Sequence, residues 1–87
     1  MKGPNIVLKD LYVGNLQWNT SEKELEEIFS QYGNIYSIKI IKDRETGKSK
    51  GFAFIKMENA DTAKASLNGY EIRGRSIKIN DSRREVN

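Results

Sequence analysis

The sequence contains neither cysteine nor histidine. Without cysteine there is no disulfide framework and no thiolate metal site, and without histidine the commonest general base and metal ligand is missing. No apolar run approaches the about 20 residues that a membrane-spanning helix needs. These absences favour a soluble, intracellular protein, cytoplasmic or, in a eukaryote, nuclear. They also predict no cofactor, no bound metal, no membrane partner and no catalytic residue.

The chain has 87 residues, which is room for one domain with a modest core. We expect a flexible lead-in over residues 1–9, a folded domain over residues 10–80 and a flexible charged tail over residues 81–87. The chain is either a stand-alone small protein or a domain excised from a longer one. In both cases a monomer is expected.

Strand and helix patterns alternate along the domain. The expected strands cover residues 10–14, 35–41, 51–57 and 76–80, and the second helix covers residues 60–67 after an Asn59 cap. The first helix begins at Ser21, where Glu24 completes a capping box, and ends at Gly33-Asn34. Its apolar stripe makes Phe29 and Tyr32 core residues.

The order strand–helix–strand–strand–helix–strand predicts an α+β fold of the ferredoxin-like kind. In this arrangement two helices pack on one face of a four-stranded antiparallel sheet. The other face of the sheet is then left bare. A bare face that carries aromatic side chains indicates a ligand.

Two short segments carry the most specific signal: LYVGNL at residues 11–16 and KGFAFIKM at residues 50–57. Both resemble the paired signature segments of the RNA recognition motif family, and the second fits the pattern [KR]-G-[FY]-[GA]-F-V-x-[FY] with Ile55 in place of Val. Met57 stands where an aromatic is usual, and by strand parity it points inward with Ala53 and Ile55. The resemblance runs from about Lys9 to Asn80 and implies the ferredoxin-like fold and RNA binding.

Strand alternation places Phe52 and Phe54 on one side of the third strand, roughly 7 Å apart. Tyr12 adds a third ring if the first and third strands are neighbours, as the resemblance implies. Bases stack on such rings with roughly 1–3 kcal/mol each, and only unpaired bases are available. The expected partner is therefore single-stranded RNA. A core role for the rings is disfavoured because Ala53, Ile55 and Met57 already supply an inward set.

Basic residues gather around the same face and the loop before the third strand. By parity these regions hold seven basic and three acidic residues, namely Asp10, Lys39, Lys42, Asp43, Arg44, Glu45, Lys48, Lys50, Lys56 and Lys78. We expect Lys50 to meet a phosphate and Lys39, Lys56, Lys78 and Asn80 to supply polar contacts. Acidic residues concentrate instead on the first helix.

Several interpretations stay open. Trp18 either packs locally or touches RNA, Ile41 either offers apolar contact or ends its strand, and the tail residues Arg83 and Arg84 are further contact candidates. Single-stranded DNA is an alternative ligand because stacking does not read the sugar. A protein-interaction role is a second alternative, although family members that bind peptides often lose the exposed aromatics.

A phosphate-binding loop is a third alternative, prompted by Gly47-Lys48-Ser49. That motif needs a glycine at position 42, where Lys42 stands, and it joins a strand to a helix. Here the segment joins two predicted strands. A plain turn is therefore the better interpretation.

Overall fold

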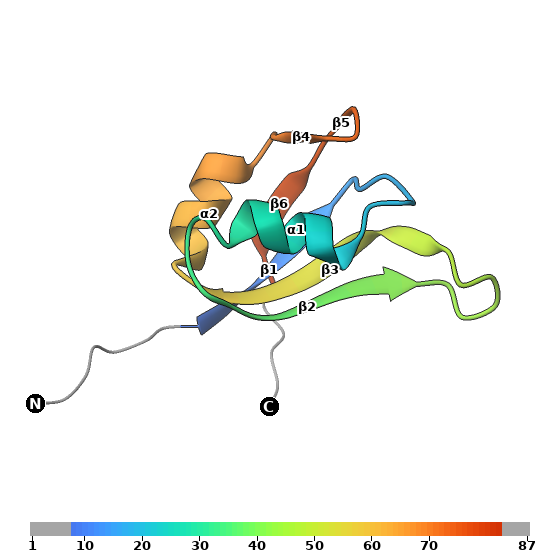
Figure 1. The fold of residues 1–87 in the computed structure, drawn as a ribbon, viewed down its shortest axis with the longest axis horizontal. Coiled ribbons are helices and arrows are strands. Elements are labelled where there is room, and N and C mark those ends of the chain that lie inside the picture. The colour runs from blue at the N-terminus through green and yellow to red at the C-terminus, as the bar shows by residue number, and fades with distance from the viewer. Residues whose placement is uncertain (1–7, 83–87) are drawn as a thin grey trace, which may run out of the picture.

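The computed structural model describes residues 8–82, and a four-stranded sheet with two helices dominates them (Figure 1). The sheet has strand order β2-β3-β1-β6 with antiparallel pairing throughout, and a separate two-stranded hairpin pairs β4 with β5. The predicted α+β ferredoxin-like fold is confirmed. The elements are β1 (Leu8–Gly14), α1 (Glu22–Phe29), β2 (Ile35–Lys42), β3 (Ser49–Glu58), α2 (Ala60–Leu67), β4 (Glu71–Ile72), β5 (Arg75–Ser76) and β6 (Lys78–Asp81).

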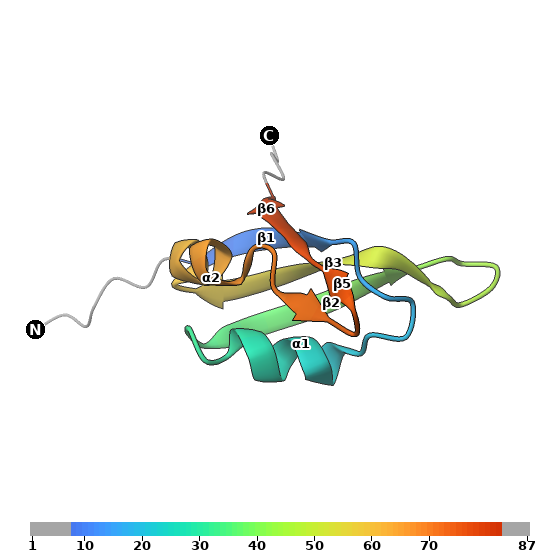
Figure 2. The same cartoon turned by 90° about the horizontal axis from the view of Figure 1, so that it is seen from above.

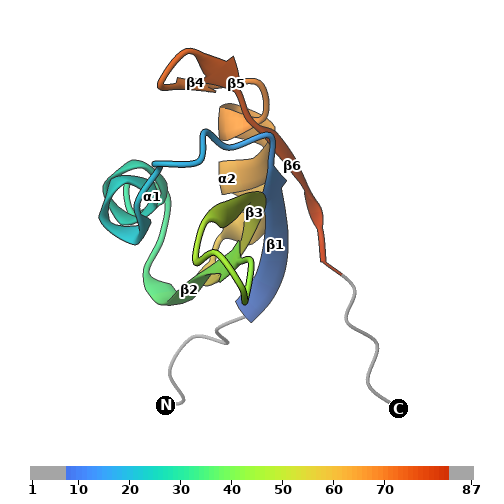
Figure 3. The same ribbon diagram turned by 90° about the vertical axis from the view of Figure 1, so that its right-hand side faces the viewer.

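The core lies between the sheet and the two helices. Figure 3 shows α1 and α2 on the same side of the sheet, which leaves its other side, the open face, uncovered by them. Met57, Ala53 and Ile55 are fully buried on the helix side, as parity predicts. Neither helix within residues 8–82 is long and apolar enough to cross a membrane. The largest fully buried side chains are Phe29, Leu11, Leu25, Ile55, Met57, Ile77, Ile79 and Val13.

Helix α1 begins as the sequence predicts but ends earlier. The Ser21 hydroxyl accepts from the Glu24 amide, and the Glu24 carboxylate accepts from the Ser21 amide, so the capping box is complete. The helix ends at Phe29 with Ser30 as its C-cap, and the expected end at Gly33-Asn34 is wrong. Gly33 serves another purpose, because a Cβ there would overlap the Glu58 carbonyl oxygen.

Helix α2 has the predicted bounds and the predicted N-cap residue, Asn59. Asn59 occupies the N-cap position in left-handed geometry, with φ +55°, and its side chain makes no capping hydrogen bond. The Asn59 amide instead donates to the Tyr32 carbonyl at 3.1 Å, tying the start of α2 to the segment after α1. Asn59 is thus the N-cap residue by position, as predicted, without a capping bond from its side chain.

The ends of the domain differ from the expected boundaries. Leu8 and Lys9 belong to β1 and pair with Glu58 and Met57, so the lead-in expected over residues 1–9 is too long by two. Residues 1–7 and 83–87 lie outside the described residues. At the other end Asp81 belongs to β6 and pairs with Leu11, so it is not the first residue of a tail.

The expected strand over residues 76–80 is also corrected. Ser76 belongs to β5 and pairs with Glu71 in the small hairpin, whereas the sheet strand starts at Lys78. Ile72 lies in β4 and is buried. The hairpin thus adds an apolar side chain to the core.

Candidate nucleic-acid interface

The open face carries a cluster of three rings, Tyr12, Phe52 and Phe54, hereafter the ring cluster. Tyr12 and Phe54 face each other across β1 and β3, which are neighbours in the sheet. The ring centroids are 5.6 Å apart for Tyr12 and Phe52, 6.0 Å for Tyr12 and Phe54, and 5.9 Å for Phe52 and Phe54. All three side chains are partly exposed, so ring surface is available to a ligand.

Strand pleat and one glycine set the position of the Tyr12 ring. Tyr12 points to the open face because its neighbours Leu11 and Val13 are fully buried on the other. The ring then lies along the strand over Gly14, where a Cβ would come within 2.7 Å of the phenol oxygen. Gly14 therefore leaves the space that the Tyr12 side chain occupies.

Polar side chains continue the row of rings across the sheet. Lys39 of β2 pairs with Phe54, and Asn80 of β6 pairs with Tyr12, so the row runs Lys39, Phe54, Tyr12, Asn80. Lys39 and Asn80 are both exposed. The row therefore has rings at its centre, on which a base can stack, and hydrogen-bonding groups at both ends, which can bind the polar edge of that base.

The remaining predicted lysines flank this row. Lys56 pairs with Asp10 one row further along the sheet, and Lys78 pairs with Gly14 at the opposite side of the row. Lys50 is exposed in β3, next to Gly51, whose φ of +89° accompanies a register shift between β2 and β3. The structure thus brings the predicted site residues Lys39, Lys50, Lys56, Lys78 and Asn80 around the ring cluster.

The loop between β2 and β3 is an ordered turn. The Asp43 carboxylate accepts from the amides of Glu45 and Thr46 at 2.8 and 3.2 Å. The Gly47 amide donates to the Asp43 carbonyl, and the Lys48 amide donates to the Thr46 hydroxyl. These amides are therefore engaged within the turn and do not form a phosphate-binding loop.

The structure exposes two aromatic residues that the sequence pattern did not single out, Tyr36 and Tyr70. Tyr36 of β2 is 52% exposed, and its hydroxyl donates to the Glu58 carboxylate at 3.1 Å. This hydrogen bond raises the pKa of the Tyr36 phenol, because deprotonation would place two negative charges together. The pairing of β2 with β3 is irregular between Ile35 and Ser37, so strict alternation along β2 does not predict that Tyr36 is exposed.

Among the residues whose roles stay open, Trp18 is 66% exposed, which disfavours the local-packing interpretation. Ile41 is half-buried within β2, one residue before the strand ends. Arg83 and Arg84 lie outside the described residues.

Comparison with known proteins agrees with this geometry. The chain is 47% identical over 73 residues to "Glycine-rich RNA-binding protein 1" from Mycosarcoma maydis, and the alignment covers 80% of this chain and 42% of that protein. Among solved structures, "RNA Binding Protein PG1" superposes with a TM-score of 0.84 at 35% identity, over 91% of this chain and 99% of that one. An Rna15 RRM with bound RNA (GU) superposes with a TM-score of 0.74 at 32% identity, over 84% of this chain and 81% of that one.

The chain thus spans less than half the length of the relative from Mycosarcoma maydis. The family model described as "RNA recognition motif" matches residues 11–78, which include both signature segments, both helices and the start of β6. The chain therefore belongs to the RNA recognition motif family.

Proposed function

We propose that this chain binds single-stranded RNA by stacking unpaired bases on the ring cluster, as a binding module and not as a catalyst. The observation that carries the proposal is the convergence of Tyr12, Phe52 and Phe54 on the open face, with centroids no more than 6.0 Å apart. Base–aromatic stacking is worth roughly 1–3 kcal/mol per base. In a duplex the bases already stack on one another, so the ligand is single-stranded.

The exposed cations around the rings would contact the RNA backbone. Lys50 lies beside the rings in β3, and Lys39, Lys56 and Lys78 come from three different strands. Each phosphate contact releases counterions, so affinity depends on salt. Asn80, opposite Tyr12, can both donate to and accept from the edge of a stacked base.

The test removes the rings without disturbing the core. Phe52→Ala together with Phe54→Ala is expected to lower affinity for single-stranded RNA by at least about thirtyfold, since about two stacking contacts are lost. Both side chains are partly exposed, so the circular dichroism spectrum should keep its native form. Tyr70→Ala is the matched control, because Tyr70 is 47% exposed and belongs to neither β1 nor β3. RNA binding that survives the double change would contradict the stacking proposal.

Single-stranded DNA is the nearest competing ligand, since stacking on the ring cluster does not distinguish the sugars. Contacts to the 2′-hydroxyl do distinguish them, and Lys39, Lys56 and Asn80, on strands β2, β3 and β6 around the rings, would make such contacts. Titration with RNA and DNA oligonucleotides of the same sequence measures the preference. We expect tighter binding of RNA, and equal affinities would show that the site does not read the sugar.

A further inference from the structure

A half-buried carboxylate, that of Asp10 in β1, lies on the open face of the sheet. Its neighbours on both sides point to the helices: Leu11 is fully buried, and the Lys9 ammonium bonds to the Asp61 carboxylate of α2 at 3.0 Å. Strand alternation therefore directs Asp10 to the open face, together with Tyr12. Figure 2 shows β1 between β6 and β3, so Asp10 belongs to an interior strand and not to an edge of the sheet.

The Asp10 carboxylate has no hydrogen-bond or ion-pair partner among residues 8–82. Lys56 is paired with Asp10 across β1 and β3, but its ammonium is not within 4.0 Å of that carboxylate. Glu58, which alternation places on the same face, differs because it accepts from the Tyr36 hydroxyl at 3.1 Å. The oxygens of Asp10 are therefore available to accept hydrogen bonds from a ligand.

Asp10 lies one row away from the ring cluster. The pair Asp10–Lys56 follows the pair Tyr12–Phe54 along the two strands, and such rows are about 7 Å apart on one face of a sheet. The Tyr12 ring extends in the opposite direction, over Gly14, so it does not cover Asp10. A base stacked on Phe54 can therefore direct its polar edge toward the Asp10 carboxylate.

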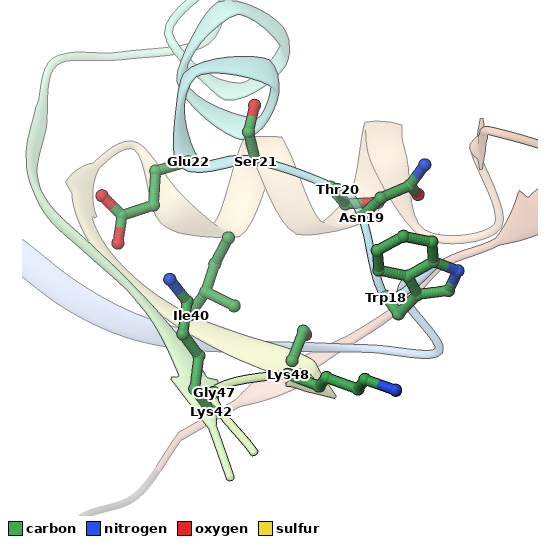
Figure 4. Close-up of a pocket in the computed structure, with 10 residues that line it drawn as sticks. Trp18, Asn19, Thr20, Ser21, Glu22, Ile40, Lys42, Gly47 and Lys48 are labelled. Carbon is green, nitrogen blue, oxygen red and sulfur yellow. The ribbon is translucent and has the colours of Figure 1, made fainter. Parts of the chain in front are cut away.

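A pocket of about 460 Å³ between the start of α1 and the β2–β3 hairpin lies on the other side of the sheet. Figure 4 shows Ile40 of β2 and Glu22 of α1 in its wall. Ile40 pairs with Ala53, which is fully buried on the helix side, so the pocket belongs to that side. It therefore does not select a base that is stacked on the ring cluster, and strand side chains of the open face make that selection.

A carboxylate beside a stacked base favours a base edge that carries hydrogen-bond donors. The Watson–Crick edge of guanine has two neighbouring donors, N1–H and the N2 amino group, one for each carboxylate oxygen. Uracil has one donor between two acceptors, and adenine and cytosine each have one amino donor next to an acceptor nitrogen. These three bases would place an acceptor against the negative carboxylate. A good bidentate contact discriminates between bases by roughly 5- to 150-fold.

We propose that Asp10 selects guanine at one position of the bound RNA, by accepting hydrogen bonds from N1 and N2 of the base that stacks on Phe54. This inference rests on the proposed RNA-binding function and adds the identity of one base to it. Lys56, directly opposite Asp10, offsets the repulsion between the carboxylate and the nearby phosphates. Asp10 is thus a specificity-determining residue whose charge is compensated within the same row.

The experiment compares labelled RNA pools of about seven nucleotides, which is enough to cover a single sheet face. One pool is randomised over all four bases, and a second is randomised over adenine, cytosine and uracil only. Fluorescence anisotropy should show that the protein binds the guanine-free pool roughly 5- to 150-fold more weakly. Equal binding of the two pools would overturn the inference and leave the proposed function standing. If the protein binds neither pool, the proposed function itself fails.

Asp10→Asn separates base selection from simple charge repulsion, because the two predict effects of opposite sign. Asparagine has one acceptor oxygen and no charge, so the variant should bind the four-base pool more weakly than the parent and lose most of the guanine preference. If Asp10 only repelled phosphates, Asp10→Asn would bind both pools more tightly, and that result would overturn the proposal. Glu26→Gln is the matched control, since it removes one exposed carboxylate from α1 and should leave the guanine preference unchanged.

A third pool, with inosine in place of guanosine, tests the second hydrogen bond, because inosine lacks the N2 amino group. The parent should bind this pool several-fold more weakly than the four-base pool, whereas Asp10→Asn should bind the two nearly alike. Equal binding by the parent would show that Asp10 does not contact N2 and would overturn the proposal. The circular dichroism spectrum of Asp10→Asn should match that of the parent, since the Asp10 side chain has no bond within residues 8–82 to lose.

Discussion

At the scale of single residues, Gly33 allows two segments to pack closely because it has no side chain. These segments are the one after α1 and the end of β3. The segment after α1 crosses the end of β3 so closely that a Cβ at Gly33 would overlap the Glu58 carbonyl oxygen. Next to it, the Glu58 amide donates to the Asn34 carbonyl at 2.9 Å, which fixes this approach. Glycine is therefore required at position 33, because the atom that a Cβ would overlap belongs to the backbone. Backbone cannot move aside as a flexible side chain can.

We expect Gly33→Ala to destabilise the protein by about 1–3 kcal/mol, the usual cost of forcing an extra carbon into a packed site. Urea denaturation followed by circular dichroism measures the change. Asn34→Ala is the matched control, since Asn34 is exposed and uses its backbone carbonyl for the bond to Glu58. If the two variants were equally stable, the backbone segments at Gly33 and Glu58 would be able to move apart without loss of folding free energy.

Single residues also mark what the sequence can and cannot predict. Alternation correctly places Ala53, Ile55 and Met57 on the helix side, because β3 is regular there and pairs on both sides. It fails for Tyr36, because a register shift in β2 between Ile35 and Ser37 breaks the two-residue period. Such a shift depends on pairing with β3, which is not encoded in the residues of β2 alone.

At the scale of elements, one charged cluster joins α1 to the β4–β5 hairpin. The Glu24 carboxylate completes the capping box at Ser21, and it also accepts from the Arg73 guanidinium, with an N–O distance of 2.6 Å. These bonds, that from Arg73 foremost, lower the pKa of Glu24 below its ordinary value of 4.5. A carboxyl group whose pKa is lower in the folded than in the unfolded protein stabilises the fold only while it is ionised.

The contribution of Glu24 is therefore present above its unfolded pKa and is lost as pH falls through its folded pKa. Glu24→Gln removes the charge but keeps an oxygen that can complete the capping box. We expect the parent to be more stable than this variant at neutral pH, with a gap that closes on acidification. Urea denaturation at a series of pH values measures the gap, and a gap that does not change with pH would contradict the ionic contribution.

Elements differ in how well their sequence predicts them. The start of α1 is predictable because Ser21 and Glu24 form a local motif three residues apart. The β4–β5 hairpin is not, because strands of two residues are too short to show a period, and the turn places Arg73, which has no turn preference, at a positive φ of 52° before Gly74. The hydrogen bond from Arg73 to Glu24 joins residues that are 49 positions apart in the sequence, so no local pattern predicts it.

At the scale of the whole molecule, the two sides of the sheet carry different charge. The open face presents Lys39, Lys56 and Lys78 beside the rings, whereas α1, on the other side, carries four glutamates within residues 22–27. An approaching polyanion is drawn to the first side and repelled by the second. The charge distribution therefore favours the orientation in which RNA meets the ring cluster.

This distribution makes a quantitative prediction about salt. If Lys39 and Lys56 each neutralise one phosphate, the slope of log affinity against log salt concentration should become shallower by about 0.7 for each lysine changed to glutamine. Lys23→Gln is the control, since Lys23 is an exposed lysine on α1, on the far side of the sheet, and its loss should leave the slope unaltered. RNA titrations at several salt concentrations give the slopes. If the slope became shallower by the same amount in all three variants, RNA binding would depend on the net charge of the protein and not on the lysines of the open face. Contact of a lysine with a defined phosphate is what would make Lys39 and Lys56 differ from Lys23.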